Sequence, residues 1–180
     1  MPPVDGTTSV ELALLAVVGL VGVAVAFVLG RRRGKGTRYA LWTTLAVVVG
    51  IIAIVTLVIP GTSDYPGGRY ANLTPGQEIE RGLDNPGSAS WFNLVGNIAM
   101  FIPLGLVVAA LIPGGFWRRL VLATGTGVVL TGGIEFLQFG MGRVADIDDI
   151  ILNSVGALVG AFVGATAASI VTAVRSRQRT

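Results

Sequence analysis

The chain has 180 residues, of which 52% are hydrophobic and 13% are charged, and its mean hydropathy is +0.75. Soluble domains carry about a quarter charged residues, so this composition indicates an integral membrane protein. The absence of cysteine and histidine excludes disulfides, thiolate nucleophiles, histidine-based triads and the usual zinc sites. The net charge is only +3, on few ionisable groups, so the sequence pI of 10.0 is no sign of a nucleic-acid partner.

Five apolar runs follow one another along the chain, and each is long enough to cross a hydrocarbon layer of about 30 Å. The first is not a cleaved signal peptide, because acidic residues precede it and the basic stretch RRRGKGTR follows it. The sequence therefore predicts an all-α polytopic membrane protein with five transmembrane helices. The runs are Val10 to Leu29, Tyr39 to Ile59, Leu94 to Ile112, Leu120 to Phe139 and Ile150 to Val174.

Basic residues are placed unevenly between these runs. Ten of the 13 lysines and arginines follow the first, third or fifth run, and the acidic residues lie on the opposite side or, as Glu135, in the outer part of the fourth run. The positive-inside rule then puts the N-terminus outside and the C-terminus in the cytoplasm. The ten basic residues are Arg31, Arg32, Arg33, Lys35, Arg38, Arg118, Arg119, Arg175, Arg177 and Arg179.

This orientation divides the chain into four parts. Residues 1–60 hold two N-terminal transmembrane helices with a basic cytoplasmic loop, and residues 61–90 form an extracytoplasmic loop. Residues 91–174 form a three-helix membrane unit, and residues 175–180 are a basic cytoplasmic tail. The outer loop is rich in Gly, Pro, Asn and Ser, so we expect little regular structure there apart from a short interfacial turn around Gln77 to Leu83.

Glycines recur at every fourth position of the last run, at Gly156, Gly160 and Gly164. Small residues at this spacing let a neighbouring helix approach backbone to backbone, which is how helices associate in lipid. We expect the partner to be the fourth run, whose segment Ala123 to Gly133 is also small on much of its surface. The stripe thus predicts helix packing and no chemistry.

Polar side chains gather where the third run begins, the fourth ends and the fifth begins. Asn93 and Asn97 share one helix face, and Glu135 and Gln138 share another. Five spans would bring these ends to one depth on the outer side. The fifth run adds Asp146, Asp149 and Asn153, which share a face if the helix begins near Ala145, whereas Asp148 points elsewhere.

Glu135 is the residue of this group that most needs an explanation. A carboxylate costs roughly 2.5 to 3.5 kcal/mol at the centre of a membrane helix, and less near the interface, so it is retained for pairing or for function. Arg143, across a tight turn, is its expected charge partner, or else Arg143 bridges Asp146 or holds an anionic group of a ligand. The alternative to function is a hydrogen-bonded clasp of caps and helix-linking asparagines.

Three stretches of the sequence hold these polar residues: NLVGNIAMFIPLG from Asn93, IEFLQ from Ile134, and GRVADIDDIILNSVGALVGA from Gly142. Together they resemble the VanZ-like family of small bacterial membrane proteins. The resemblance covers Asn93 to Gly164 and implies a multi-pass protein of the bacterial cytoplasmic membrane, since the founding member is associated with teicoplanin resistance. Asn97, Glu135, Gln138, Arg143, Asp146, Asp149 and Asn153 correspond to the family's polar positions.

The first hypothesis for function is a non-catalytic protein of the cell envelope with an outward-facing polar pocket and no cofactor. Its partners would be membrane lipids, and among them a lipid-linked envelope precursor, or a lipoglycopeptide such as teicoplanin. No feature of the sequence fixes the oligomeric state. The expected ligand-binding residues are Asn93, Asn97, Glu135, Gln138, Arg143, Asp146, Asp149 and Asn153.

Two further hypotheses remain. In a membrane enzyme acting on a lipid phosphate or glycosyl head group, Glu135, Asp146 and Asp149 are the candidate catalytic residues and would offer oxygen ligands to Mg²⁺. Glu135 would otherwise serve as a general base. A transporter is disfavoured, because the inner halves of the runs lack ionisable residues and no inverted repeat is evident.

Overall fold

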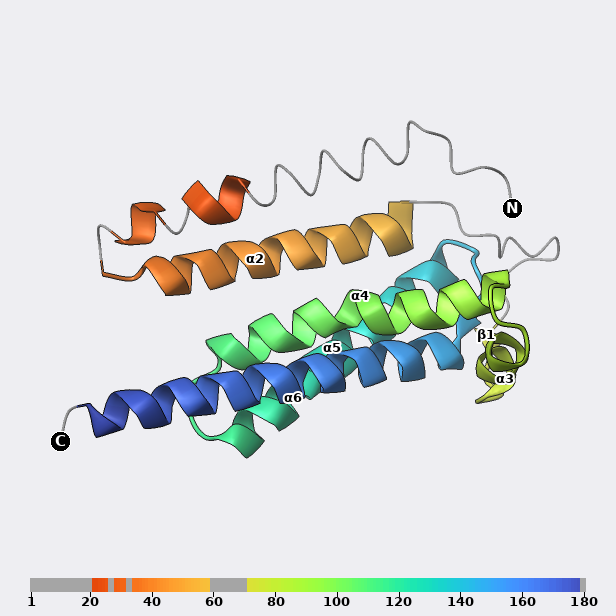
Figure 1. Ribbon diagram of the computed structural model, residues 1–180. Coiled ribbons are helices and arrows are strands. Elements are labelled where there is room, and N and C mark those ends of the chain that lie inside the picture. The colour runs from red at the N-terminus through yellow and green to blue at the C-terminus, as the bar shows by residue number, and fades with distance from the viewer. Residues whose placement is uncertain (1–20, 26–27, 32–33, 59–70, 179–180) are drawn as a thin grey trace. The chain divides into compact units, whose positions relative to one another are not determined.

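The computed structural model describes residues 21–25, 28–31, 34–58 and 71–178 (Figure 1). Four helical segments there are long and apolar enough to cross a membrane: Gly36–Val58, Ala89–Leu111, Phe116–Gly140 and Ile147–Arg177. The predicted all-α membrane architecture is therefore confirmed for these four. Most of the first apolar run lies outside the described residues, although residues 21–25 and 28–31 are described and are helical. The count of five spans and the orientation of the termini therefore stay predictions.

The chain divides into two compact units, Met1–Val48 and Val49–Thr180. In the first, the peptide turns after residue 31 in a helix C-terminal motif, where Gly34 has a φ of +67° and its N–H donates to Arg31 O at 3.1 Å. Glycine suits this left-handed conformation because it has no Cβ. Helix α2, Gly36–Ala53, follows at once and runs into a π-helix, η1, Ile54–Val58.

The second unit is dominated by three long helices that lie side by side (Figure 1). They are α4, Ala89–Leu111, α5, Phe116–Gly140, and α6, Ile147–Arg177. Ser88 caps α4 by accepting a hydrogen bond from Trp91 N, and Asp146 caps α6 by accepting one from Asp148 N. Their facing sides bury a core in which Phe101, Ala123 and Ala157 have no exposed surface.

The glycine stripe of α6 packs against α4, and the expectation that it faces α5 is wrong. A Cβ added at Gly156, Gly160 or Gly164 would overlap a main-chain oxygen of α4, that of Ile98, Ile102 or Leu106 respectively. α4 contributes Gly105 to the seam, where an added Cβ would overlap the main-chain oxygen of Ala157 of α6. The prediction failed because α5 meets α6 through a single close glycine, Gly127 against Ala157, whereas a Cβ added at Gly125, Gly132 or Gly133 would meet nothing within 4 Å.

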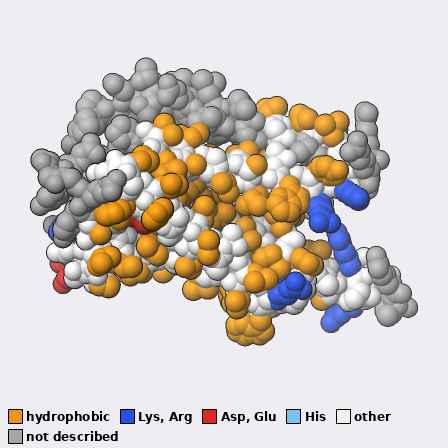
Figure 2. All heavy atoms as spheres, turned by 180° about the vertical axis from the view of Figure 1, so that it is seen from behind, with side chains coloured by type: hydrophobic (Ala, Val, Ile, Leu, Met, Phe, Trp, Pro, Cys, Tyr) orange, Lys and Arg blue, Asp and Glu red, His pale blue; other side chains and the backbone are white. Residues whose placement is uncertain are grey.

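The outward faces of the bundle are apolar, as a lipid-facing surface requires. Val129 and Phe136 of α5 are each 76% exposed. Figure 2 shows hydrophobic side chains over one such face, with Lys and Arg side chains toward the end where α6 finishes. Arg175 and Arg177 lie in the last turn of α6, at the end where α5 begins with Arg118 and Arg119.

A short segment that precedes α4, residues 71–84, completes the second unit, and we call it the outer segment because it lies outside the three-helix bundle. Strand β1, Ala71–Asn72, pairs in parallel with β2, Ala145–Asp146, so that Asn72 lies opposite Asp146. Helix α3, Gln77–Asp84, covers the region where a short interfacial turn was expected. The connection between α5 and α6 is thus fixed to the segment that precedes α4.

Candidate functional site

The polar residues singled out in the sequence lie at one end of the second unit, where α4 and α6 begin and α5 and η1 end. We call this the polar end. α5 stops in a Schellman motif: Arg143 N donates to Gln138 O at 3.0 Å and Gly142 N donates to Phe139 O at 3.1 Å. Gly142 takes a φ of +83°, which glycine adopts without strain. This turn directs the chain from Gln138 to Asp146.

Glu135 lies in the last two turns of α5 and is only 5% exposed. Its Oε2 accepts a hydrogen bond from Asp146 N at 2.9 Å, so the carboxylate fixes the main chain just before α6. Asp146 was expected on the helical face of Asp149 and Asn153. It is instead the N-cap residue of α6, outside the helix, and its side chain satisfies the otherwise unpaired N–H of Asp148.

Asp149 joins α6 to α4. Its Oδ1 accepts hydrogen bonds from Asn97 Nδ2 at 2.6 Å and from Asn93 Nδ2 at 3.1 Å. The two asparagines lie one turn apart on α4, so their amides reach the same oxygen from successive turns. Asn93 is exposed and Asn97 is half-buried, which places this junction at the rim of the bundle.

One turn deeper on α6, Asn153 joins that helix to α5. Its Nδ2 donates to Thr131 Oγ1 at 2.8 Å, and both residues are buried. Its amide oxygen is buried too, and has no partner among the described residues. Thr131 lies one turn before Glu135 on α5, so the two polar contacts between α5 and α6 are stacked.

Arg143 and Gln138 both bind the π-helix. Arg143 Nη1 donates to Thr56 O at 2.6 Å, and Gln138 Nε2 donates to the same oxygen at 2.9 Å. The expected ion pair of Arg143 with Glu135 or Asp146 is wrong for the described residues, whose one ion pair joins Arg81 and Glu78. Arg143 binds Thr56 O because the end of η1 leaves main-chain carbonyls without helical partners, and a guanidinium is a good donor to such an oxygen.

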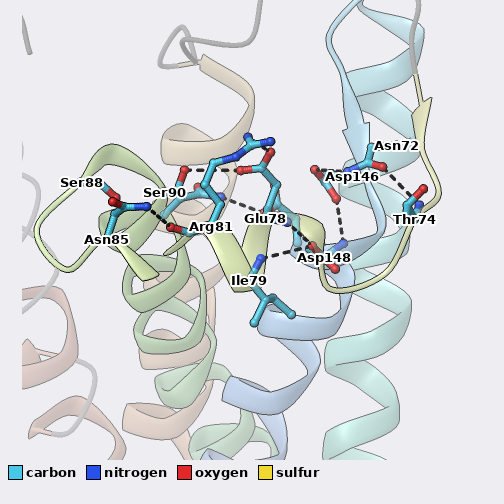
Figure 3. Close-up of polar contacts among 12 residues, drawn as sticks. Asn72, Thr74, Glu78, Ile79, Arg81, Asn85, Ser88, Ser90, Asp146 and Asp148 are labelled. Atoms are coloured by element: carbon cyan, nitrogen blue, oxygen red, sulfur yellow. Dashed lines mark hydrogen bonds and ion pairs between the residues drawn. The ribbon is translucent and has the colours of Figure 1, made fainter. Parts of the chain in front are cut away.

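Asp148 is the polar residue whose role the sequence did not reveal. It has no exposed surface, and it accepts hydrogen bonds from Gly76 N at 2.6 Å, Glu78 N at 2.8 Å and Ile79 N at 3.4 Å (Figure 3). These are N–H groups at the start of α3, where a negative charge is favourable. A signal was present: an acid at the start of a membrane helix, pointing away from the other polar residues, must bind something outside the bundle.

Asn72 adds a second contact between the outer segment and α6. Its Nδ2 donates to Asp146 Oδ2 at 3.2 Å, and its Oδ1 accepts from Thr74 N at 3.2 Å. Together with Asp148, this contact fixes β1 and α3 over the start of α6 (Figure 3). Each oxygen of Asp146 therefore has a partner.

A protein-family model described as VanZ/LLP1 matches residues 41–168, which is more than half of the chain. The chain belongs to the VanZ-like family. The match starts within α2 and includes the outer segment, so it extends well beyond the stretch from Asn93 to Gly164 that carries the motifs. No curated protein and no solved structure matches the chain.

The VanZ-like motifs fall on the polar end in a definite arrangement. Asn97 and Asp149 join α4 to α6, Glu135 holds the α6 cap, and Asn153 joins α6 to α5. Gln138 and Arg143 bind η1, an element that sequence reasoning had not connected with the motifs. These motif residues thus link α4, α5, α6 and η1 at the polar end.

The metal alternative named Glu135, Asp146 and Asp149 as ligands. In the parts of the chain that the structure describes, no group of three or more acidic side chains is arranged to hold a metal ion. Asp146 already binds Asn72 and its own helix start, and Asp149 binds two asparagines. Mg²⁺ binding stays a prediction of the sequence.

Proposed function

We propose that this VanZ-like protein binds, without turnover, the polar head group of an envelope molecule at its polar end. The ligand class is a lipid-linked envelope component or a lipoglycopeptide such as teicoplanin. The observation that carries the proposal is that separate helices deliver polar side chains to one end of an otherwise apolar bundle. A purely structural clasp would explain the hydrogen bonds. It would not explain why Asn93 is exposed at the rim, or why the charged Arg143 binds a neutral carbonyl.

We further propose that the polar end faces outward in the bacterial cytoplasmic membrane, with the N-terminus outside, five spans and the C-terminus inside. The arginines at the opposite end of α5 and α6 support this orientation under the positive-inside rule. An outward-facing site would meet head groups and antibiotics directly. Contribution to teicoplanin resistance is part of the proposal through family membership.

Lipid identification tests the proposal. The full chain is purified from its native membrane, and co-purifying lipids are compared by mass spectrometry between the wild type, Arg143→Gln and Arg118→Gln. Arg118 is exposed at the opposite end and serves as a matched control. We expect a specific lipid that Arg143→Gln loses and Arg118→Gln keeps. The same bulk lipids in all three proteins, together with no saturable binding of teicoplanin, would contradict the proposal.

The resistance part has its own measurement. Growth inhibition by teicoplanin is compared in bacterial cells with the wild-type chain, with Arg143→Gln and without the chain. We expect the wild-type chain to raise the inhibitory concentration and Arg143→Gln to do so less at equal membrane abundance. An inhibitory concentration independent of the chain would remove antibiotic resistance from the proposal and leave lipid binding to the first experiment.

A further inference from the structure

The hydrogen bonds at the polar end leave acceptors unused on two carboxylates. Asn93 and Asn97 both donate to Oδ1 of Asp149, and no described residue donates to its Oδ2. Glu135 receives its one hydrogen bond on Oε2, and no described residue donates to its Oε1. Both amide donors thus bind the same oxygen of Asp149. One oxygen of Asp149 and one oxygen of Glu135 have no donor among the described residues.

The polar end carries more negative than positive side chains. Glu135, Asp146 and Asp149 bring three carboxylates, and Glu78 adds a fourth near Asp149, whereas Arg143 lies near Glu135. Asp148 is compensated separately by the start of α3. Carboxylates inside a membrane protein are costly unless a cation or a donor compensates them. A ligand that fits here supplies positive charge and N–H donors.

Asn153 gives an independent indication of the same chemistry. It is 3% exposed, and its amide oxygen is buried with no partner among the described residues. Side chains on a helix lean toward its N-terminus, so Asn153 leans toward Asp149, one turn away. Its own partner, Thr131, lies one turn from Glu135. An orphan buried acceptor is rare, and this one belongs to a side chain one turn further along α6 than Asp149.

A primary ammonium matches this arrangement. It carries three donors, no acceptor and one positive charge, so it can bind carboxylate oxygens of Asp149 and Glu135 together and still offer a donor. A hydroxyl offers one donor and no charge. A phosphate alone offers acceptors and negative charge, which these carboxylates would repel.

We propose that the polar end selects head groups bearing a primary ammonium, with Asp149 and Glu135 as its binding residues and Asn153 as a deeper acceptor. This inference rests on the proposed function, because it names the chemical class of the head group. Arg143, at the edge of the same end, is free of any carboxylate partner among the described residues and suits the phosphate that adjoins the ammonium in a zwitterionic lipid.

The test compares lipids that differ only at nitrogen. The full chain is reconstituted in nanodiscs of phosphatidylglycerol with increasing phosphatidylethanolamine or N-acetyl-phosphatidylethanolamine, and lipids retained by the protein are counted by native mass spectrometry. We expect phosphatidylethanolamine to be retained at least about tenfold more tightly than its N-acetyl form. Retention that soluble phosphoethanolamine does not displace supports a lipid-borne ammonium, and displacement supports a free one.

Variants locate the selection. Asp149→Asn preserves size and should abolish the preference for the amine, and Asn153→Leu should weaken it. Asp84→Asn on α3 should leave it unchanged, because Asp84 is exposed and takes no part in the hydrogen bonds of Asp149, Glu135 or Asn153. If Asp149→Asn does not fold, the lipid pair on the wild type still decides. Equal retention of the amine and its N-acetyl form would overturn the ammonium inference and leave head-group binding intact. No specific lipid in any nanodisc or native preparation would overturn both.

Discussion

Helix α6 contacts its neighbours in two contrasting ways along its length. In the glycine seam, formed by Gly156, Gly160 and Gly164 against α4, backbones approach until a single methyl group would overlap the facing chain. At the polar end, one to two turns earlier, the same helix is held by Asp149 and Asn153 through side-chain hydrogen bonds.

The contrast shows how this chain divides stability from recognition. The seam uses no polar side chain, so it fixes the two helices without leaving any group that a ligand could bind. The polar end joins the same helices through groups that keep unused acceptors. The dry seam therefore allows the polar end to carry uncompensated groups, which a bundle held only by hydrogen bonds would not tolerate.

The largest expected effect is in the seam. Gly160→Ala places a Cβ where the main-chain oxygen of Ile102 lies, and backbone on both sides leaves little room to relax. We expect the bundle to lose about 3 kcal/mol or more, at the upper end of overpacking costs. Unfolding in mixed micelles of increasing denaturing detergent measures this loss.

Gly125→Ala is the matched control, because a Cβ at Gly125 of α5 would meet nothing within 4 Å. It should be neutral or add up to about 1 kcal/mol through the better helix propensity of alanine. Equal losses in the two variants would show that the close approach of α4 and α6 is not the reason for the cost of Gly160→Ala.

The next effect concerns the outer segment. Asp148→Asn removes the charge that three N–H groups of α3 share, and should cost about 2 kcal/mol. Because these contacts lie outside the seam, the loss should be local. Hydrogen exchange should accelerate at residues 76–79 and stay unchanged in α4 and α6, while Asp84→Asn should alter neither. Faster exchange throughout α6 would show that the outer segment supports the bundle itself.

A smaller effect is expected at the buried pair of α5 and α6. Thr131→Val keeps the shape but removes the acceptor for Asn153 Nδ2, which should cost about 1 to 2 kcal/mol. The double variant Thr131→Val with Asn153→Leu should recover most of that loss, since no polar group is then left unpaired. Detergent unfolding measures both. A double variant less stable than Thr131→Val would give Asn153 a packing role that the hydrogen bond does not explain.

Much of this contrast was predictable from the sequence, within definite limits. The lengths of the apolar runs predicted the membrane helices, and the spacing of the glycines predicted a close seam, because both are local features of the sequence. The partner of the seam was predicted wrongly. Small residues on two helices do not reveal which pair of faces meets, and here the fit of Gly105 against α6 decides for α4.

The candidate site shows the same limit for long-range contacts. The convergence of Asn97, Glu135 and Asp149 on one end followed from helix direction alone, and the structure places them there. The binding of Arg143 to Thr56 O depends on the π-helix η1, which no residue pattern in the sequence predicts. The contact of Asp148 with α3 joins positions more than 60 residues apart, and so required the folded chain.

The smallest expected effect separates two explanations for how α3 is held. Arg81→Gln removes the ion pair with Glu78, in which the Arg81 side chain is 54% exposed. Pairs this exposed contribute about 0.2 to 1 kcal/mol, because water screens the charges and ordering two long side chains costs entropy. Hydrogen exchange at residues 76–79 should therefore change far less than in Asp148→Asn. An equal change would mean that α3 depends on its own surface charges, and Asp148 would then lose its place as the residue that fixes the outer segment to the membrane bundle.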